Sequence, residues 1–256
     1  MAGQVIVSDH PHAEGVVAVT LSNPVRLNAM TRAMWRALRD VFTALQTRTG
    51  VRCVIVRGEG AAFCAGGDIA EYPEFRFSPD SLRAFHEDDV WGGLAAMLDC
   101  DVPLVAQIEG ACMGAGVEIA SCCDLRVAGA SSKFGAPIAR LGFPMAPREA
   151  WLVRNAAGDA TAREMLLSAA VLDAPRMQSR GFVQQVVADA QVATHALDIA
   201  KSIAGLAPQA ARLNKQALRA LRGPCPPSDA QAYGYADSRE HREGIAAFID
   251  KRKPVF

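Results

Sequence analysis

Two glycine-containing segments dominate this sequence of 256 residues: GEGAAFCAGGDI at residues 58–69 and GACMGAGVEI at residues 110–119. Each follows a short β-branched run and precedes a helical pattern, so we expect each to join a strand to a helix. Small residues at such a junction let a ligand approach the backbone closely. The first N–H groups of a helix also lack partners within it and lie at the positive end of its dipole, which suits an anion or a developing oxyanion.

The elements around these segments predict an α/β domain. Runs typical of strands occupy residues 16–21, 52–57, 103–108 and 124–128. Thr31 is a predicted N-cap, because apolar residues recur after it at helical spacing as far as Leu45. A second helix is predicted from about Ser81 to Leu98. Strands that alternate with helices favour a sheet built from parallel crossovers.

The pattern changes near residue 200. Helices are predicted over residues 207–222 and 228–251, and the sequence GPCPP at 223–227 separates them. We therefore expect an α/β core over residues 1–200 and a helical region over residues 201–256.

Composition excludes several classes of protein. Lysine plus arginine and aspartate plus glutamate each number 27, so the formal net charge is zero, and a dedicated nucleic-acid binder is not expected. No stretch reaches the ~18–20 apolar residues of a membrane helix, and the first residues lack a secretory signal pattern. The seven cysteines form no CxxC pair and no zinc-like cluster. A reduced, cytoplasmic protein without a metal site is expected.

The two loops suggest one kind of chemistry. If they face each other, they supply two N–H donors to one carbonyl oxygen. The plainer alternative is that the glycines only allow strand and helix to pack closely. Phosphate binding is disfavoured, because neither loop matches GxxxxGK[ST] or a GxGxxG fingerprint with its later acidic residue. The chain also lacks the GxSxG elbow of a serine hydrolase.

The sequence resembles the crotonase (enoyl-CoA hydratase/isomerase) superfamily. Short motifs carry the resemblance in family order from about residue 5 to the C-terminus. Besides the two loops they are LSNP (21–24), LNAM (27–30), CDLRVA (123–128), FGAP (134–137), REGI (242–245) and FIDKRK (248–253). The resemblance implies a spiral of ββα units that binds acyl-CoA thioesters. It also implies that residues 201–256 serve oligomerisation into trimers or dimers of trimers.

The resemblance further implies roles for individual residues. The N–H groups of Gly67 and Ala115 match the two family donors that hold the thioester oxygen. The implied coenzyme A-binding residues are Arg26, Ala65, Gly67, Asp68, Ile69 and Lys251. Coenzyme A enters as part of the substrate, so no separate cofactor is implied.

Glu118 matches the first of the two catalytic glutamates of family hydratases. Removing the proton α to a thioester creates an enolate, and two fixed N–H donors stabilise its oxygen most when it is charged. We therefore expect Glu118 to move this proton. Without the resemblance, an acidic residue favoured by the helix N-terminus explains Glu118 equally well.

The chain departs from the family at the second glutamate. Ile138 stands at that position and can neither accept nor deliver a proton, which argues against water addition by two carboxylates. Glu149 is the nearest replacement, but we expect a solvated glutamate there, in the first turn of a helix. His86 is likewise expected on a solvated polar face. Four aromatic residues are assigned to core or acyl pocket without distinction: Phe75, Phe77, Phe85 and Trp91.

The leading hypothesis is a cytoplasmic acyl-CoA enzyme of fatty acid metabolism, a lyase or an isomerase, with hydration of a 2-enoyl-CoA as the default reaction. Double-bond migration, decarboxylation or carbon–carbon chemistry with a single glutamate fits the residues at least as well. Ile138 also motivates a non-catalytic acyl-CoA-binding protein. A hydrolase on the same scaffold is disfavoured, because no histidine follows the second loop until His195. The expected partner is an acyl-CoA thioester, with no nucleic acid and no membrane.

Overall fold

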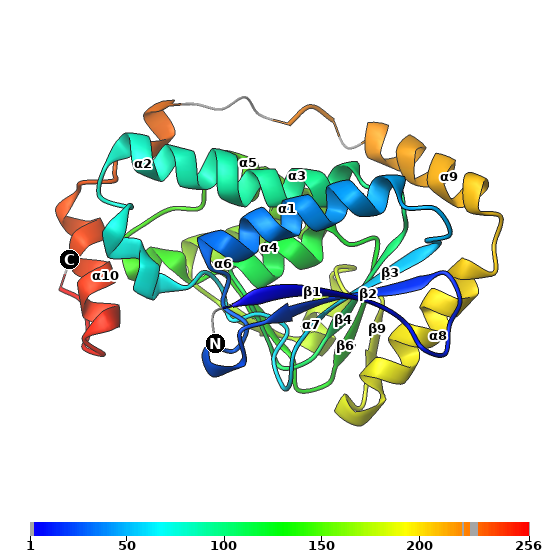
Figure 1. The fold of residues 1–256 in the computed structure, drawn as a ribbon. Helices are drawn as coiled ribbons and strands as arrows, with labels where there is room; N and C mark the ends of the chain where they lie inside the picture. Colours follow the sequence, from blue (N-terminus) through cyan, green and yellow to red (C-terminus); the bar gives the residue numbers. More distant parts are fainter. Residues whose placement is uncertain (1–2, 222, 226–229, 256) are drawn as a thin grey trace.

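The computed structural model describes residues 3–221, 223–225 and 230–255 (Figure 1). The strands are β1 (Gln4–Asp9), β2 (Val16–Ser22), β3 (Cys53–Gly58), β4 (Leu104–Ile108), β5 (Ala111–Met113), β6 (Leu125–Gly129), β7 (Lys133–Gly135), β8 (Val171–Asp173) and β9 (Gln185–Val187). The α-helices are α1 (Arg32–Thr47), α2 (Pro79–Ala84), α3 (Trp91–Asp99), α4 (Ala115–Cys122), α5 (Pro147–Ala157), α6 (Asp159–Leu167), α7 (Ala174–Ser179), α8 (Val192–Ala204), α9 (Pro208–Ala220) and α10 (Arg239–Ile249). Short 3-10 turns are η1 (Pro24–Arg26), η2 (Ile69–Glu74), η4 (Ile138–Leu141), η5 (Asp189–Gln191) and η6 (Ala230–Tyr233).

The main sheet has the strand order β1-β2-β3-β4-β6-β9. All neighbours from β2 to β9 pair in parallel, and β1 closes one edge in the antiparallel direction. The four predicted strands correspond to β2, β3, β4 and β6, with ends that differ by one residue. The prediction of an α/β domain with parallel crossovers is therefore confirmed.

Helices cover both faces of this sheet (Figure 1). One face packs Val54 and Val56 of β3 into the core cluster that contains Trp35 and Leu38 of α1. The other face packs Ile55, from between those two valines, into a cluster with α8. Strands that are buried on both faces are apolar at successive positions. This is why these strands could be predicted from apolar runs in the sequence.

A smaller sheet with the order β5-β7-β8 lies where the main strands end. Two residues separate β4 from β5, the first strand of this sheet, and a single residue, Gly114, separates β5 from α4. This β4-β5-α4 path is one turn of a ββα spiral, and it carries the second glycine loop. Thr31 caps α1 as predicted, since its Oγ1 accepts a hydrogen bond from the Met34 N–H at 3.1 Å.

The helix expected over residues 81–98 is confirmed, since α2, the π-helical segment η3 (Phe85–Val90) and α3 follow one another without a break. The prediction of one long C-terminal helix is wrong in detail. The helix expected over residues 228–251 consists of η6 and α10, with a non-helical link between them. Its first two residues, and residues 222, 226 and 227 of the preceding segment, lie outside the described residues. α9 lies within the first predicted range, and α10 packs on η2 and η4.

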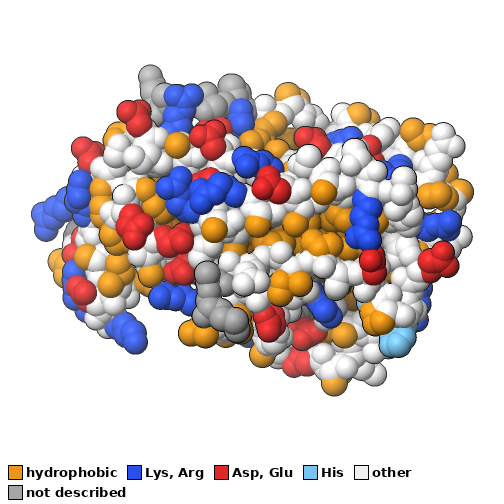
Figure 2. Space-filling model, in the orientation of Figure 1, with side chains coloured by type: hydrophobic (Ala, Val, Ile, Leu, Met, Phe, Trp, Pro, Cys, Tyr) orange, Lys and Arg blue, Asp and Glu red, His pale blue; other side chains and the backbone are white. Residues whose placement is uncertain are grey.

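Charged side chains of both signs are interspersed on the face of the molecule in Figure 2, with a band of hydrophobic side chains across its middle. This face therefore carries no broad region of one sign. Within the part of the chain that the structure describes, no helix combines the length and the apolarity needed to cross a membrane.

The contact between α1 and α3 generates a prediction about two adjacent glycines. A Cβ at Gly93 would lie 3.0 Å from both Cε3 and the carbonyl oxygen of Trp35, whereas a Cβ at Gly92 would meet only the Arg39 side chain, at 3.5 Å. Gly93→Ala should therefore lower the free energy of unfolding by about 1–3 kcal/mol through overpacking. Gly92→Ala should raise it by up to about 1 kcal/mol through helix propensity. Urea unfolding of both variants measures the difference, and equal values would contradict the close packing of Gly93 on Trp35.

Candidate active site

The two glycine-containing loops run side by side. The Cys64 N–H donates to the Ala111 carbonyl at 2.9 Å, and the Met113 N–H donates back to the Cys64 carbonyl at 2.8 Å. Gly116 must lack a side chain because a Cβ there would lie 2.6 Å from the Cys64 carbonyl oxygen. Backbone hydrogen bonds therefore fix the spacing of the two strand exits.

The N–H of Gly67 points away from the segment around Met30, with which its neighbours pair. The Met30 N–H donates to the Gly66 carbonyl, and the Asp68 N–H donates to the Met30 carbonyl, both at 2.8 Å. In such a parallel pairing the residue between the two bonds turns its own N–H to the opposite side. Among the described residues, the Gly67 N–H has no backbone acceptor.

Ala115 supplies the corresponding N–H from the second loop. It is the first residue of α4, so its N–H has no partner within the helix. Gly114 before it has φ 47° and ψ −110°, a conformation that only glycine adopts readily. At the other end of α4, the guanidinium of Arg126 donates to the carbonyls of Ala120 and Cys123, which stabilises the helix dipole.

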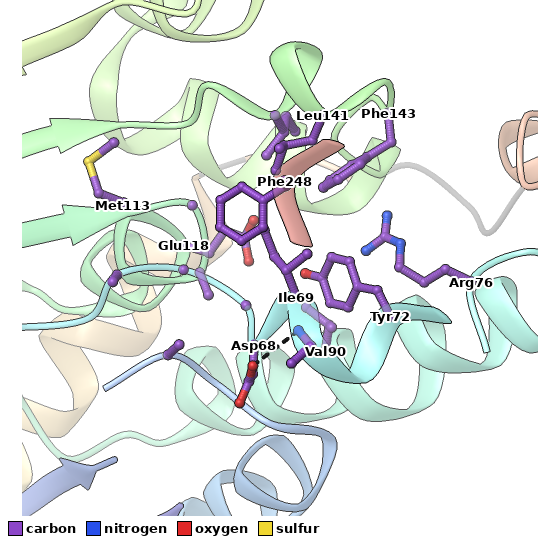
Figure 3. Close-up of a pocket in the computed structure, with 18 of the residues that line it drawn as sticks. Asp68, Ile69, Tyr72, Arg76, Val90, Met113, Glu118, Leu141, Phe143 and Phe248 are labelled. Carbon is purple, nitrogen blue, oxygen red and sulfur yellow. Dashed lines mark hydrogen bonds between the residues drawn. The ribbon is translucent and has the colours of Figure 1, made fainter. Parts of the chain in front are cut away.

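Both glycine loops open into one cavity of about 750 Å³. The predicted site residues all line it: Arg26, Ala65, Gly67, Asp68, Ile69, Ala115, Glu118 and Lys251. The Arg26 side chain is half exposed and pairs with the buried Asp68 at 3.3 Å, and Lys251 follows α10 on the same cavity wall. Figure 3 shows Phe248 of α10 reaching into the same space beside Glu118 and Leu141.

Glu118 and Glu149 are two buried carboxyl groups in this cavity. Burial, and then the charge of Glu149, raise the pKa of Glu118 well above its ordinary value, while Arg76 opposes the shift. Burial also raises the pKa of Glu149 to about 8 against the effect of Arg76. Two carboxyl groups that disfavour each other's charge hold a proton near neutral pH, which equips them for acid–base chemistry.

The expectations of a solvated Glu149 and a solvated His86 are wrong. His86 lies on the π-helical segment η3 and is buried, and its Nδ1 is 2.6 Å from Oε1 of Glu149. Burial, followed by the charge of Arg76, lowers the pKa of His86 well below its ordinary value, so the imidazole is neutral. The π-helical segment and the inward face of α5 thus bring together two polar groups 63 residues apart.

Arg76 and Tyr72 are cavity residues that the sequence analysis missed. Arg76 is 1% exposed, and its guanidinium lies over the rings of Tyr72 and Phe143 at 4.2 and 4.1 Å from their centroids (Figure 3). The aromatic neighbours of Arg76 in sequence were its only available signal. Of the four unassigned aromatic residues, Phe85 is on the cavity wall; Phe75 is core, and Phe77 and Trp91 pack against the core.

Comparison with known proteins places these features in a known family. The family model of enoyl-CoA hydratase/isomerase matches residues 12–256. A 2,3-dehydroadipyl-CoA hydratase of Escherichia coli is 32% identical over 250 residues, which cover 94% of each protein. An enoyl-CoA hydratase/carnithine racemase from Magnetospirillum magneticum has a TM-score of 0.82 and 35% identity, covering 98% of this chain and 94% of the other. A methylmalonyl-CoA decarboxylase in complex with 2-nitronate-propionyl-CoA has a TM-score of 0.86 and 25% identity, covering 98% and 97%.

The position of Ala115 generates a test of the paired N–H donors. Proline is well tolerated at the first residue of a helix and removes the N–H. Ala115→Pro should therefore stay folded and lose about 10²–10³ in kcat on an acyl-CoA substrate. Ala115→Gly keeps the N–H and should lose far less. A folded proline variant with the kcat of the wild type would show that this N–H takes no part in the reaction.

The raised carboxyl pKa values predict the pH dependence of stability. Between pH 6.5 and 8 the folded Glu149 retains a proton that the unfolded chain releases, so the free energy of unfolding should fall as pH rises. The buried histidines have lowered pKa values, so they change the free energy of unfolding with pH only below about pH 6.5.

Glu149→Gln should reduce the fall, as followed by urea unfolding at several pH values in this window. Glu243→Gln is the matched control, because that carboxyl, paired with Arg252, has a pKa of about 2 and stays ionised throughout. An unchanged slope in Glu149→Gln would contradict a protonated Glu149.

Proposed function

Because the chain belongs to the enoyl-CoA hydratase/isomerase family, we propose that it adds water across the double bond of a 2-enoyl-CoA thioester. The predicted resemblance and the crotonase-like fold are confirmed. The family consists of enzymes that act on acyl-CoA thioesters, and it includes hydratases and decarboxylases, so membership alone does not select the reaction.

One observation carries the choice of hydration. Glu118 and Glu149 line the same cavity as the N–H groups of Gly67 and Ala115. Hydration needs one group that takes a proton from water and another that delivers a proton to the α carbon, and two carboxyl groups divide this work. Ile138 stands at the position of the family's second glutamate, but Glu149 of α5 places a carboxyl group in the cavity.

The proposed reaction proceeds through an enolate. Glu149 acts in its ionised form, which becomes more populated as the pH approaches its pKa of about 8. Held by the Nδ1–H of neutral His86, it takes a proton from water as the oxygen bonds to the β carbon. The electron pair of the double bond moves onto the thioester oxygen, where the Gly67 and Ala115 N–H groups stabilise it. Protonated Glu118 then delivers its proton to the α carbon. The donors and carboxyl groups suffice for this chemistry, so the proposal includes no separate cofactor.

Binding of coenzyme A is proposed along Ala65–Ile69, with Arg26 and Lys251 near the phosphates. Both cations line the cavity, and the backbone of the first loop forms part of its wall. This arrangement leaves the thioester next to Gly67 and directs the acyl chain inward, toward Glu149 and Arg76.

A decarboxylase is the second candidate. Ile138 presents an apolar side chain to the cavity, and an apolar wall favours loss of a carboxylate because it disfavours the charged form. Formation of carbon dioxide from an α-carboxyacyl-CoA, with no hydration of any 2-enoyl-CoA, would select this candidate.

We also propose that the chain is a cytoplasmic enzyme of acyl-CoA metabolism that self-associates through residues 201–256. The support is α9, which exposes Leu213 and Leu218 and has no buried residue of its own. Exposed apolar faces of this kind mark protein–protein contacts. Light scattering should give the mass of a trimer or a hexamer, and Leu213→Glu with Leu218→Glu should lower it.

The hydration proposal predicts different losses in two variants. Glu118→Gln should lose hydration and also exchange of the α proton of a saturated acyl-CoA in heavy water. Glu149→Gln should lose hydration by about 10²–10⁴ but keep α-proton exchange. Loss of the enoyl absorbance follows hydration, and mass spectrometry follows exchange.

Glu71→Gln is the matched control for both variants. Glu71 accepts a hydrogen bond from the Arg32 N–H at 2.9 Å and is outside the cavity wall, and glutamine preserves an acceptor there. Its activity should stay close to that of the wild type. Tight binding of acyl-CoA without hydration or exchange would instead support a non-catalytic binding protein.

A further inference from the structure

Arg76 is a buried cation at the acyl end of the cavity. It follows η2, and its guanidinium contacts the rings of Tyr72 and Phe143, which meet edge to face with centroids 6.0 Å apart, while the Phe85 centroid is 5.7 Å away (Figure 3). Cation–π contacts of this kind stabilise the positive charge. They do not use the N–H groups of the guanidinium, which remain available as hydrogen-bond donors.

The hydrogen-bonding capacity of Arg76 is almost unused. Its single hydrogen bond within the described chain is from Nη2 to the Tyr235 hydroxyl, at 3.5 Å. Its Nε is buried without an acceptor. A guanidinium has five N–H donors, and leaving buried donors of a charged group unsatisfied costs substantial stability.

Arg76 also lacks an anionic partner. No described carboxylate lies within ion-pair distance of it, although Glu118 and Glu149 share its cavity. Burial raises the pKa of both carboxyl groups and so disfavours their charge, and neither contacts Arg76. A buried charge of this kind is normally paired. The missing partner must therefore reach the cavity with the ligand.

We infer that Arg76 binds an anionic group on the acyl chain, so that the substrate class is an acyl-CoA that carries a carboxylate beyond its reacting carbons. A carboxylate accepts two hydrogen bonds from a guanidinium and supplies its counter-charge. The inference names the substrate of the proposed hydratase and rests on that function for its turnover assay. Its binding assay is independent of the reaction.

The turnover test compares 2-enoyl-CoA thioesters with 2-enedioyl-CoA monothioesters of equal length, over a short homologous series. At the best length the wild type should favour the carboxylated substrate by about 30-fold or more in kcat/KM, the lower end expected for a buried charge pair. Arg76→Met keeps volume and flexibility without charge, and it should abolish the preference. Arg76→Lys should restore part of it, because lysine keeps the charge but not the fork.

Arg26→Gln is the matched control at the opposite end of the cavity. It should weaken both substrates by the same factor, because it removes a cation near coenzyme A and not near the acyl chain. The binding test uses calorimetry with the saturated counterparts of both classes, so it does not require turnover. Thermal unfolding verifies that each variant is folded.

The outcomes separate the inference from the proposed function. Tighter binding of the carboxylated ligand that disappears in Arg76→Met supports the inference, even if no hydration is seen, in which case only the hydratase proposal fails. Equal binding of both classes by the wild type overturns the inference, and so does a preference that survives in Arg76→Met. A rate loss in Arg76→Met that is equal for both classes also overturns it, because Arg76 would then act only on the carboxyl groups.

Discussion

The site depends on backbone hydrogen bonds that hold two strand exits together. Cys64 bonds to both neighbours of Cys112, and Met30 bonds to both neighbours of Gly67. These pairings use the Gly66 carbonyl and the Asp68 N–H but not the Gly67 N–H, and the first turn of α4 likewise leaves the Ala115 N–H without a partner in the helix. The donors are therefore oriented by the fold itself and need no rearrangement when charge develops on a substrate oxygen.

An apolar cavity then changes the behaviour of the side chains around those donors. Burial raises the pKa of Glu118 and Glu149 and lowers the pKa of His86, so it favours the neutral form of each group. The guanidinium of Arg76 lies in the same surroundings, in contact with the rings of Tyr72 and Phe143. The interior of the cavity thus combines two carboxyl groups of raised pKa, a neutral imidazole and a buried guanidinium, which is a combination that water would not maintain.

The sequence predicted the parts of the site that are local along the chain. The strands, the Thr31 cap, the two loops and Glu118 all have signals within about ten residues, and the structure gathers the predicted residues around one cavity. The pairing of His86 with Glu149 has no such signal, because it depends on the π-helical segment Phe85–Val90 and on the rotation of α5. Arg76 has no local signal either, because its surroundings come from residues distant in sequence. The isoleucine at position 138 indicates a missing carboxyl group, and nothing in the sequence shows that Glu149 of α5 supplies another.

The packing of Arg76 against aromatic rings has a consequence for the size of the ligand. A buried guanidinium packed against Tyr72 and Phe143 cannot follow a shorter or longer chain, and the two N–H donors at the other end are equally immobile. The distance between Arg76 and the two N–H donors is therefore fixed by the fold. Such a site selects a molecule by the separation of its functional groups, while the bulk of the carbon chain between them matters less.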